Sequence, residues 1–201
     1  MQLVRQQFLD ALERDPTDIL ASVWILNRIP YPFGGDISSY ASWRHDLARD
    51  LNVDPSALLI TGSAAFGISL NPNKNYREFD SFSDIDVAVV SDHHFSEGWR
   101  TLRNLGPKLH SLPPASKQAV SDHVQRLIYW GTIATDRILS LLPYGLQWQS
   151  ALTAASKRSP TQGRNIKIRV YRDLDSLRAY QVNNLNALKN DYLSREIPNH
   201  V

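Results

Sequence analysis

Two stretches of this chain decide its fold: ALLITGSAAFG at 57–67 and SDIDVAVVS at 83–91. Each contains a short apolar run of the kind that forms a buried strand. The first run passes directly into Gly62, which predicts a tight turn out of the strand. Asp84 and Asp86 stand at the start of the second run, and they share a face if the strand includes both, because side chains two positions apart in a strand point the same way. The two stretches therefore predict a sheet that presents two carboxylates side by side.

These residues predict a site for a phosphate ligand and a cation. Asp84 and Asp86 repel each other unless a cation neutralises them, and Mg²⁺ or Mn²⁺ is bound by one or two carboxylates together with substrate phosphates. Gly62 allows a ligand to approach the backbone, and Ser63 with the free N–H groups of a following helix can hold an anion. Taken singly, the acid pair also fits a turn that leads into a strand, and Ser63 fits an ordinary helix cap.

In this combination the chain resembles the DNA polymerase β-type nucleotidyltransferase superfamily. The family motif is an apolar strand, Gly-Ser, a short spacer, and Asp-x-Asp in a second apolar strand. Gly62, Ser63, Asp84 and Asp86 match it residue by residue. The chain is most similar to the small bacterial members, which include relatives of toxin–antitoxin and anti-phage defence systems. The resemblance covers about residues 57–92 of the 201.

The resemblance implies a metal-dependent nucleotidyltransferase, which moves a nucleoside monophosphate from an NTP to a hydroxyl acceptor on a protein, an RNA or a small molecule. Asp84 and Asp86 would be the catalytic metal ligands for Mg²⁺ or Mn²⁺, and Gly62 and Ser63 would bind the nucleotide. The alternative is a catalytically degenerate member that binds nucleotide, RNA or a protein partner from the same system and acts as a regulator.

The spacer between Ser63 and Asp84 departs from the family pattern. It has 20 residues, 64–83, which is longer than the family's usual gap. Its two bases, Lys74 and Arg77, either reach toward the phosphates or belong to a plain surface loop.

The second departure is that no third carboxylate is evident, although active members usually place one on a later strand. The best later strand, 166–171, carries Lys167 and Arg169 at its polar positions instead. Arg169 could clamp the triphosphate, or the site could be degenerate. Asp173 follows that strand and is the candidate for the missing acid. Asp122 and Asp136 are poorer candidates, since both fall in a predicted helix.

Hydrophobic periodicity and breakers predict the other elements. We expect helices over 2–14, 18–28, 39–51, 115–141 and 145–157, strands over 57–61, 86–91 and 166–171, and a last helix from Asp173 or Asp175 to about Leu193. His93 and His94 are expected in a loop or turn. The pattern predicts an α/β (α+β) fold with a small mixed sheet of nucleotidyltransferase type and packed helices.

One domain is expected over 1–201. It divides into N-terminal helices at 1–54, a motif-bearing core at 55–92, a helical insertion at 113–158, and a final strand and helix at 164–195. The chain has no cysteine, which excludes disulfide scaffolds and thiol catalysis. It shows neither an apolar run long enough for a membrane span nor a signal peptide. We therefore expect a cytoplasmic protein without membrane contact.

Charge is unevenly distributed along the chain. Residues 1–100 hold 8 Lys and Arg against 14 Asp and Glu, and residues 101–201 hold 14 against 6. The basic residues are densest between Lys157 and Arg178. This segment could bind a polyanion such as a nucleotide or a nucleic acid, or it could pair with the acidic half of the chain.

Overall fold

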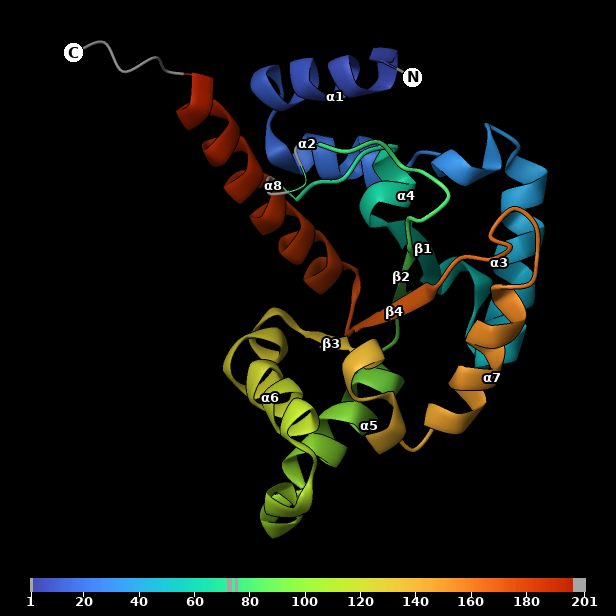
Figure 1. Cartoon of the computed structure of the whole chain (residues 1–201), viewed down its shortest axis with the longest axis vertical. Coiled ribbons are helices and arrows are strands. Elements are labelled where there is room, and N and C mark those ends of the chain that lie inside the picture. Colours follow the sequence, from blue (N-terminus) through green and yellow to red (C-terminus); the bar gives the residue numbers. More distant parts are fainter. Residues whose placement is uncertain (1, 72–73, 75, 197–201) are drawn as a thin grey trace.

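The computed structural model describes residues 2–71, 74 and 76–196, and shows a four-stranded mixed sheet packed with helices. The predicted α/β (α+β) class with a small mixed sheet is confirmed. Figure 1 shows α1, α2 and α8 above the sheet and α5 and α6 below it. The helices are α1 (Gln2–Arg14), α2 (Thr17–Ala21), α3 (Ile37–Leu51), α4 (Gly62–Phe66), α5 (Asp92–Arg103), α6 (Pro114–Asp122), α7 (Gly145–Ala155) and α8 (Leu174–Glu196).

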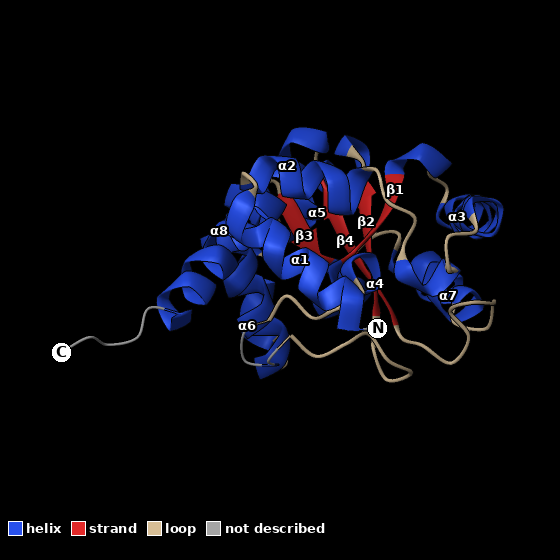
Figure 2. Ribbon diagram, turned by 90° about the horizontal axis from the view of Figure 1, so that it is seen from above, coloured by secondary structure: helices blue, strands red, loops and turns tan. Residues whose placement is uncertain are grey.

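The strands run in the order β1-β2-β4-β3, with β1 and β3 at the edges. They are β1 (Leu58–Thr61), β2 (Ile85–Val90), β3 (Thr132–Ala134) and β4 (Ile166–Tyr171). The central pair, β2 and β4, is parallel, and each edge strand is antiparallel to its neighbour. Parallel neighbours need a long connection, and here the chain from 91 to 165 supplies it. Figure 2 shows the four strands surrounded by helices.

The two faces of the central strands are different. On one face, the buried aliphatic side chains of β2 and β4 belong to a core shared with α3, α5 and α7: Ile85, Val87, Val89, Ile166, Ile168 and Val170. On the other face, Ala88 and Tyr171 pack with Leu177 of α8. On that second face, apolar side chains cover only part of the central strands, because the remaining positions carry charged residues.

The predicted helix over 115–141 is wrong. Helical structure continues past α6 only to Trp130, through π-type and 3₁₀ turns, and β3 begins at Thr132. Gly131 ends the helix with a φ of +61°, a left-handed conformation that favours glycine, and Ser176 lies where a Cβ would be. The short apolar stretch after it is a buried edge strand, which periodicity alone does not separate from a helix.

His93 and His94 are also placed differently from the prediction of a loop or turn. Both lie in α5, which begins one residue earlier and is capped by Ser91, whose hydroxyl accepts a hydrogen bond from the His94 N–H. In the part of the chain that the structure describes, no helix is both long enough and apolar enough to cross a membrane.

Candidate functional site at the start of the central strands

Asp86 lies on the face of the sheet opposite the core, and Asp84 lies just before the same strand. Ile85 and Val87 point into the core, so the alternation of a strand sends Asp86 to the opposite face. Asp84 immediately precedes the strand, and both carboxylates are half-buried. The acid pair therefore sits where β2 begins, at the edge of a cavity.

The glycine turn lies directly against this pair. Thr61, the last residue of β1, is opposite Asp86, and its hydroxyl lies 3.4 Å from the Asp86 carbonyl oxygen. Gly62 follows with a φ of +62°, and a Cβ built there would run into the Asp86 carboxylate. The turn needs glycine both for its backbone conformation and for this close approach.

Strand β4 brings two cations to the same face. Its register places Lys167 beside Asp86, and the Lys167 Nζ lies 2.5 Å from Oδ2 of Asp84. Arg169, two positions along, donates a hydrogen bond to the Tyr180 hydroxyl, with its guanidinium 4.9 Å from the ring centroid. The two acids of β2 are thus matched by two bases on the neighbouring strand.

Burial and neighbouring charges change the acidity of these groups. Burial raises the pKa of the Asp86 carboxyl; the charge of Lys167 opposes this, and Asp84 and Asp136 reinforce it. The hydrogen bond to Asp84 raises the pKa of Lys167, while burial works against it. The Lys167 amine therefore carries its positive charge at neutral pH.

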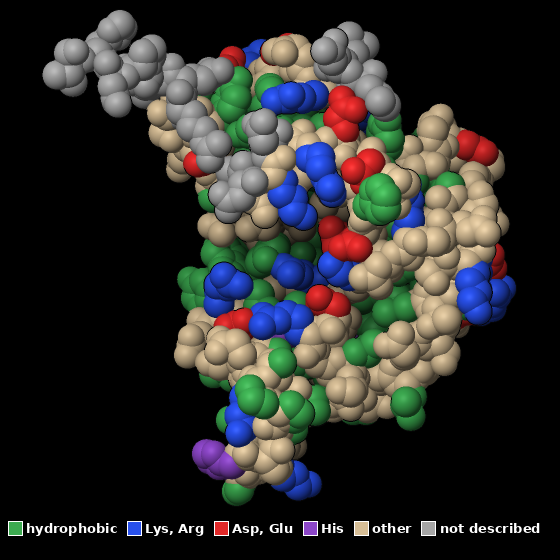
Figure 3. Space-filling model, in the orientation of Figure 1, with side chains coloured by type: hydrophobic (Ala, Val, Ile, Leu, Met, Phe, Trp, Pro, Cys, Tyr) green, Lys and Arg blue, Asp and Glu red, His purple; other side chains and the backbone are tan. Residues whose placement is uncertain are grey.

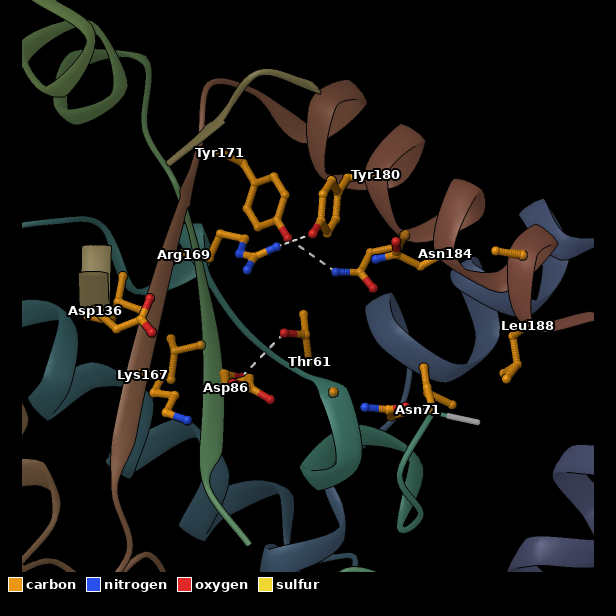
Figure 4. A pocket seen from close by; sticks show the side chains of 16 residues that line it. Thr61, Asn71, Asp86, Asp136, Lys167, Arg169, Tyr171, Tyr180, Asn184 and Leu188 are labelled. Atoms are coloured by element: carbon orange, nitrogen blue, oxygen red, sulfur yellow. Dashed lines mark hydrogen bonds between the residues drawn. The ribbon is translucent and has the colours of Figure 1, made fainter. Parts of the chain in front are cut away.

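Two cavities meet at Asp86. The large cavity, of about 550 Å³, lies between the sheet and α8 (Figure 4), and its polar lining includes Lys167, Arg169, Tyr180 and Asn184. The small cavity, of about 280 Å³, is lined by residues of the glycine turn and the spacer. Both share Gly62, Leu70, Asn71 and Asp86 as lining residues. Figure 3 shows acidic and basic side chains gathered in the hollowed middle of this face.

The predicted phosphate contacts lie at these cavities. Lys74 and Arg77 line the small cavity together with Ser63 and Asp84, and Arg77 also has Asp80 as an ion-pair partner at 3.6 Å. Phe82 lines the same cavity and is 86% exposed as a residue, so an aromatic side chain is available beside these bases. No sequence pattern had marked Phe82, because loop aromatic residues have no periodicity to assign them.

Asp173 does not lie with the acid pair. It follows the far end of β4, where its carboxylate accepts a hydrogen bond from the Ser176 N–H at 2.7 Å and caps α8, and it pairs with Arg172. These partners lower the pKa of Asp173 to about 2. The structure explains Asp173 as a helix cap, and does not bring it to Asp84.

Asp136 lies nearer to the acid pair than its predicted helical position implied. It lies in the short turn Thr135–Arg137, which directly follows β3, and lines the large cavity with Asp86 and Lys167. With Lys167 it also lines a third cavity of about 550 Å³ beside α7. The sequence signal was the apolar segment before it, which belongs to a strand and not to the expected helix.

Several bases between Lys157 and Arg178 are paired within the protein. Arg158 contacts Asp50 at 2.5 Å, Lys167 contacts Asp84, and Arg164 donates hydrogen bonds to the backbone carbonyls of Asp80 and Ser83. These contacts match the expectation that the basic half pairs with the acidic half, and they leave less charge for a polyanion.

The acid pair is the part of this site whose residue chemistry suits a divalent cation. Within residues 2–71, 74 and 76–196, no three histidine, aspartate or glutamate side chains form a group that could hold a metal ion. Asp86 could bind one Mg²⁺ that also contacts substrate phosphates. Asp84 already has the Lys167 ammonium as its partner.

Comparison with protein-family models, with curated proteins and with solved structures found no match to this chain.

Proposed function

We propose that this protein binds a nucleoside triphosphate across the two joined cavities and transfers its nucleoside monophosphate to a hydroxyl acceptor. The observation that carries the proposal is the meeting of the large and small cavities at Asp86, beside the Gly62 turn. A volume of about 550 Å³ is in the range of ligand pockets. The nucleoside would occupy the large cavity, and the phosphates would extend into the small one.

The residues around the cavities have roles that their chemistry supports. Lys74 and Arg77 would bind the outer phosphates, and Ser63 would donate its hydroxyl to one of them. Arg169 would contribute positive charge beside the transferred phosphate. Catalysis of this kind consists mostly of positioning and charge stabilisation. A divalent cation held by Asp86 would supply further charge neutralisation at the phosphates.

The second candidate function is nucleotide binding without turnover. The ion pair between Lys167 and Asp84 favours it, because one of the two expected metal ligands is engaged by a protein cation. A regulatory role with an RNA or a protein partner of the same system would then replace catalysis. Both functions fit a cytoplasmic protein with access to NTPs.

A thermal-shift panel tests the nucleotide site without knowledge of the acceptor. It uses ATP, GTP, CTP and UTP, each with and without Mg²⁺ or Mn²⁺, on wild type and on Asp84→Ala/Asp86→Ala. A nucleotide at about 100 times its Kd stabilises the fold by roughly 2.7 kcal/mol, which raises Tm by several degrees. We expect a shift with one or more nucleotides in wild type and none in the double variant. An equal shift in both proteins would contradict the assignment of the site.

Pyrophosphate release separates the two candidate functions. We expect release in the presence of Mg²⁺ or Mn²⁺ and an acceptor, and its loss in Asp86→Ala with the fold intact by circular dichroism. Release that persists in Asp86→Ala would remove Asp86 from the mechanism. Binding with no release under any condition would favour the regulatory function.

A further inference from the structure

Lys167 occupies the space in which a cation is expected. Two neighbouring carboxylates need a positive charge between or beside them, and the Lys167 Nζ lies 2.5 Å from Asp84 Oδ2 and next to Asp86 in the sheet register. The protein thus supplies part of the neutralisation from its own chain.

The fold fixes Lys167 on this face of the sheet. Ile166 and Ile168 flank it and are 4% and 1% exposed, so the strand cannot rotate without exposing both. Parallel pairing with β2 then sets Lys167 on the face of the acids. Arg169, the next base on that face, is held by Tyr180 through a hydrogen bond and a ring contact, and does not compete for Asp84.

We propose that the Lys167 ammonium takes the place of one divalent cation at Asp84, so that the site holds at most one metal ion, at Asp86. The amine occupies an Asp84 oxygen that a metal would otherwise bind, and its charge repels a dication at that oxygen. This inference rests on the proposed function in treating the acid pair as the metal-binding end of the site.

Direct Mn²⁺ binding tests the inference without any measurement of turnover. Free Mn²⁺ is followed by electron paramagnetic resonance during titration of wild type, Lys167→Met and Lys167→Met/Asp84→Asn. We expect Lys167→Met to bind Mn²⁺ at least about tenfold more tightly than wild type, because both the competing amine and its charge are gone. The added Asp84→Asn change removes the gain, since the freed ligand is then absent.

Two further variants keep the result specific. Lys157→Met removes the same charge from an exposed position, and should leave Mn²⁺ affinity at the wild-type value. Lys167→Gln retains a polar group without charge and should repeat the gain; it also replaces Lys167→Met if that variant unfolds. Circular dichroism and denaturant unfolding establish that each variant is folded.

The inference is overturned if Lys167→Met and Lys167→Gln bind Mn²⁺ no more tightly than wild type, or if the gain survives Asp84→Asn. The thermal-shift panel is read separately. A gain of Mn²⁺ affinity in a protein that binds no nucleotide would support Lys167 as the resident cation and reject the proposed function. Nucleotide binding without a gain of Mn²⁺ affinity would support the nucleotide site and reject Lys167 as the resident cation.

Discussion

Two polar regions of the sheet meet their hydrogen-bonding and charge requirements in different ways. At the β3 edge, His123 is fully buried between neutral backbone groups. Its Nδ1 lies 2.6 Å from the Ala119 carbonyl, and its Nε2 accepts a hydrogen bond from the Ala134 N–H at 3.1 Å. Both ring nitrogens are used, which requires a neutral ring with its proton on Nδ1.

The start of β2 and β4 is organised by charge instead. Four ionisable side chains lie here, each half-buried at the wall of a cavity that is open to solvent: Asp84, Asp86, Lys167 and Arg169. Burial raises the pKa of Asp86, so the fold holds this carboxylate in an environment that disfavours its charge.

The difference distinguishes polar groups that stabilise the fold from polar groups that are available to a ligand. Neutral groups with complete backbone partners hold an edge strand in place, and their loss should cost stability. Charged groups that line a cavity contribute less to the fold and more to a ligand.

Replacing His123 with leucine should have the largest effect. The Ala134 N–H would stay buried without a partner, and the Ala119 carbonyl would keep only the hydrogen bond from the backbone N–H of residue 123. A loss of about 2–4 kcal/mol in the free energy of unfolding is expected. Urea denaturation measures it. Gln125→Leu, an exposed change in the same helical segment, should stay within about 0.5 kcal/mol of wild type. Equal effects of the two changes would refute a structural role for His123.

Gly62→Ala should have a smaller effect on stability and a large one on ligand binding. The left-handed backbone costs a non-glycine residue about 1–2 kcal/mol, and the new Cβ would also push the Asp86 carboxylate aside. We expect a loss of about 2 kcal/mol and loss of the nucleotide-induced thermal shift. Gly163 is the matched control, because its φ is +75° and nothing lies within 4 Å of a Cβ built there. Gly163→Ala should lose only the backbone part and keep the nucleotide shift.

The pH dependence of folding should be the smallest effect. Burial lowers the pKa of His123, and that of His94 in the same direction. The unfolded chain takes up these protons near pH 6.5 while the folded chain does not, so the contribution of these two histidines to stability is complete above that pH and is lost as the pH is lowered. One such proton changes the free energy by at most about 1.4 kcal/mol per pH unit. Urea unfolding at pH 7.5, 6.5 and 5.5 measures the slope, and a stability that stays level or rises toward pH 5.5 would contradict it.

Local patterns predicted the elements that are amphipathic or bounded by breakers. Alternation of apolar and basic residues gave the bounds of β4 at 166–171, and the stripe at 2–14 became α1. The predicted 115–141 helix was wrong because β3 has only three residues. Its pairing with β4 stabilises it, and such a contact has no local signature.

Part of the candidate site could also be predicted from local sequence patterns. Gly62, Ser63, Asp84 and Asp86 lie together because they occupy neighbouring strands and the turn between them. Asp173 lies away from the acids because the parallel register puts the end of β4 at the far side of the sheet, and the sequence alone does not give the direction of that strand. Asp136 was undervalued because β3 was not recognised.

The sequence by itself determined the two motif strands and the glycine turn, since these follow from chain-local geometry. Only the tertiary structure decided that β4 lies parallel to β2 and that the Lys167 amine binds Asp84. Strand neighbours separated by about 80 residues are selected by packing of the whole core. The charge balance of the acid pair therefore depends on a contact that no local pattern specifies.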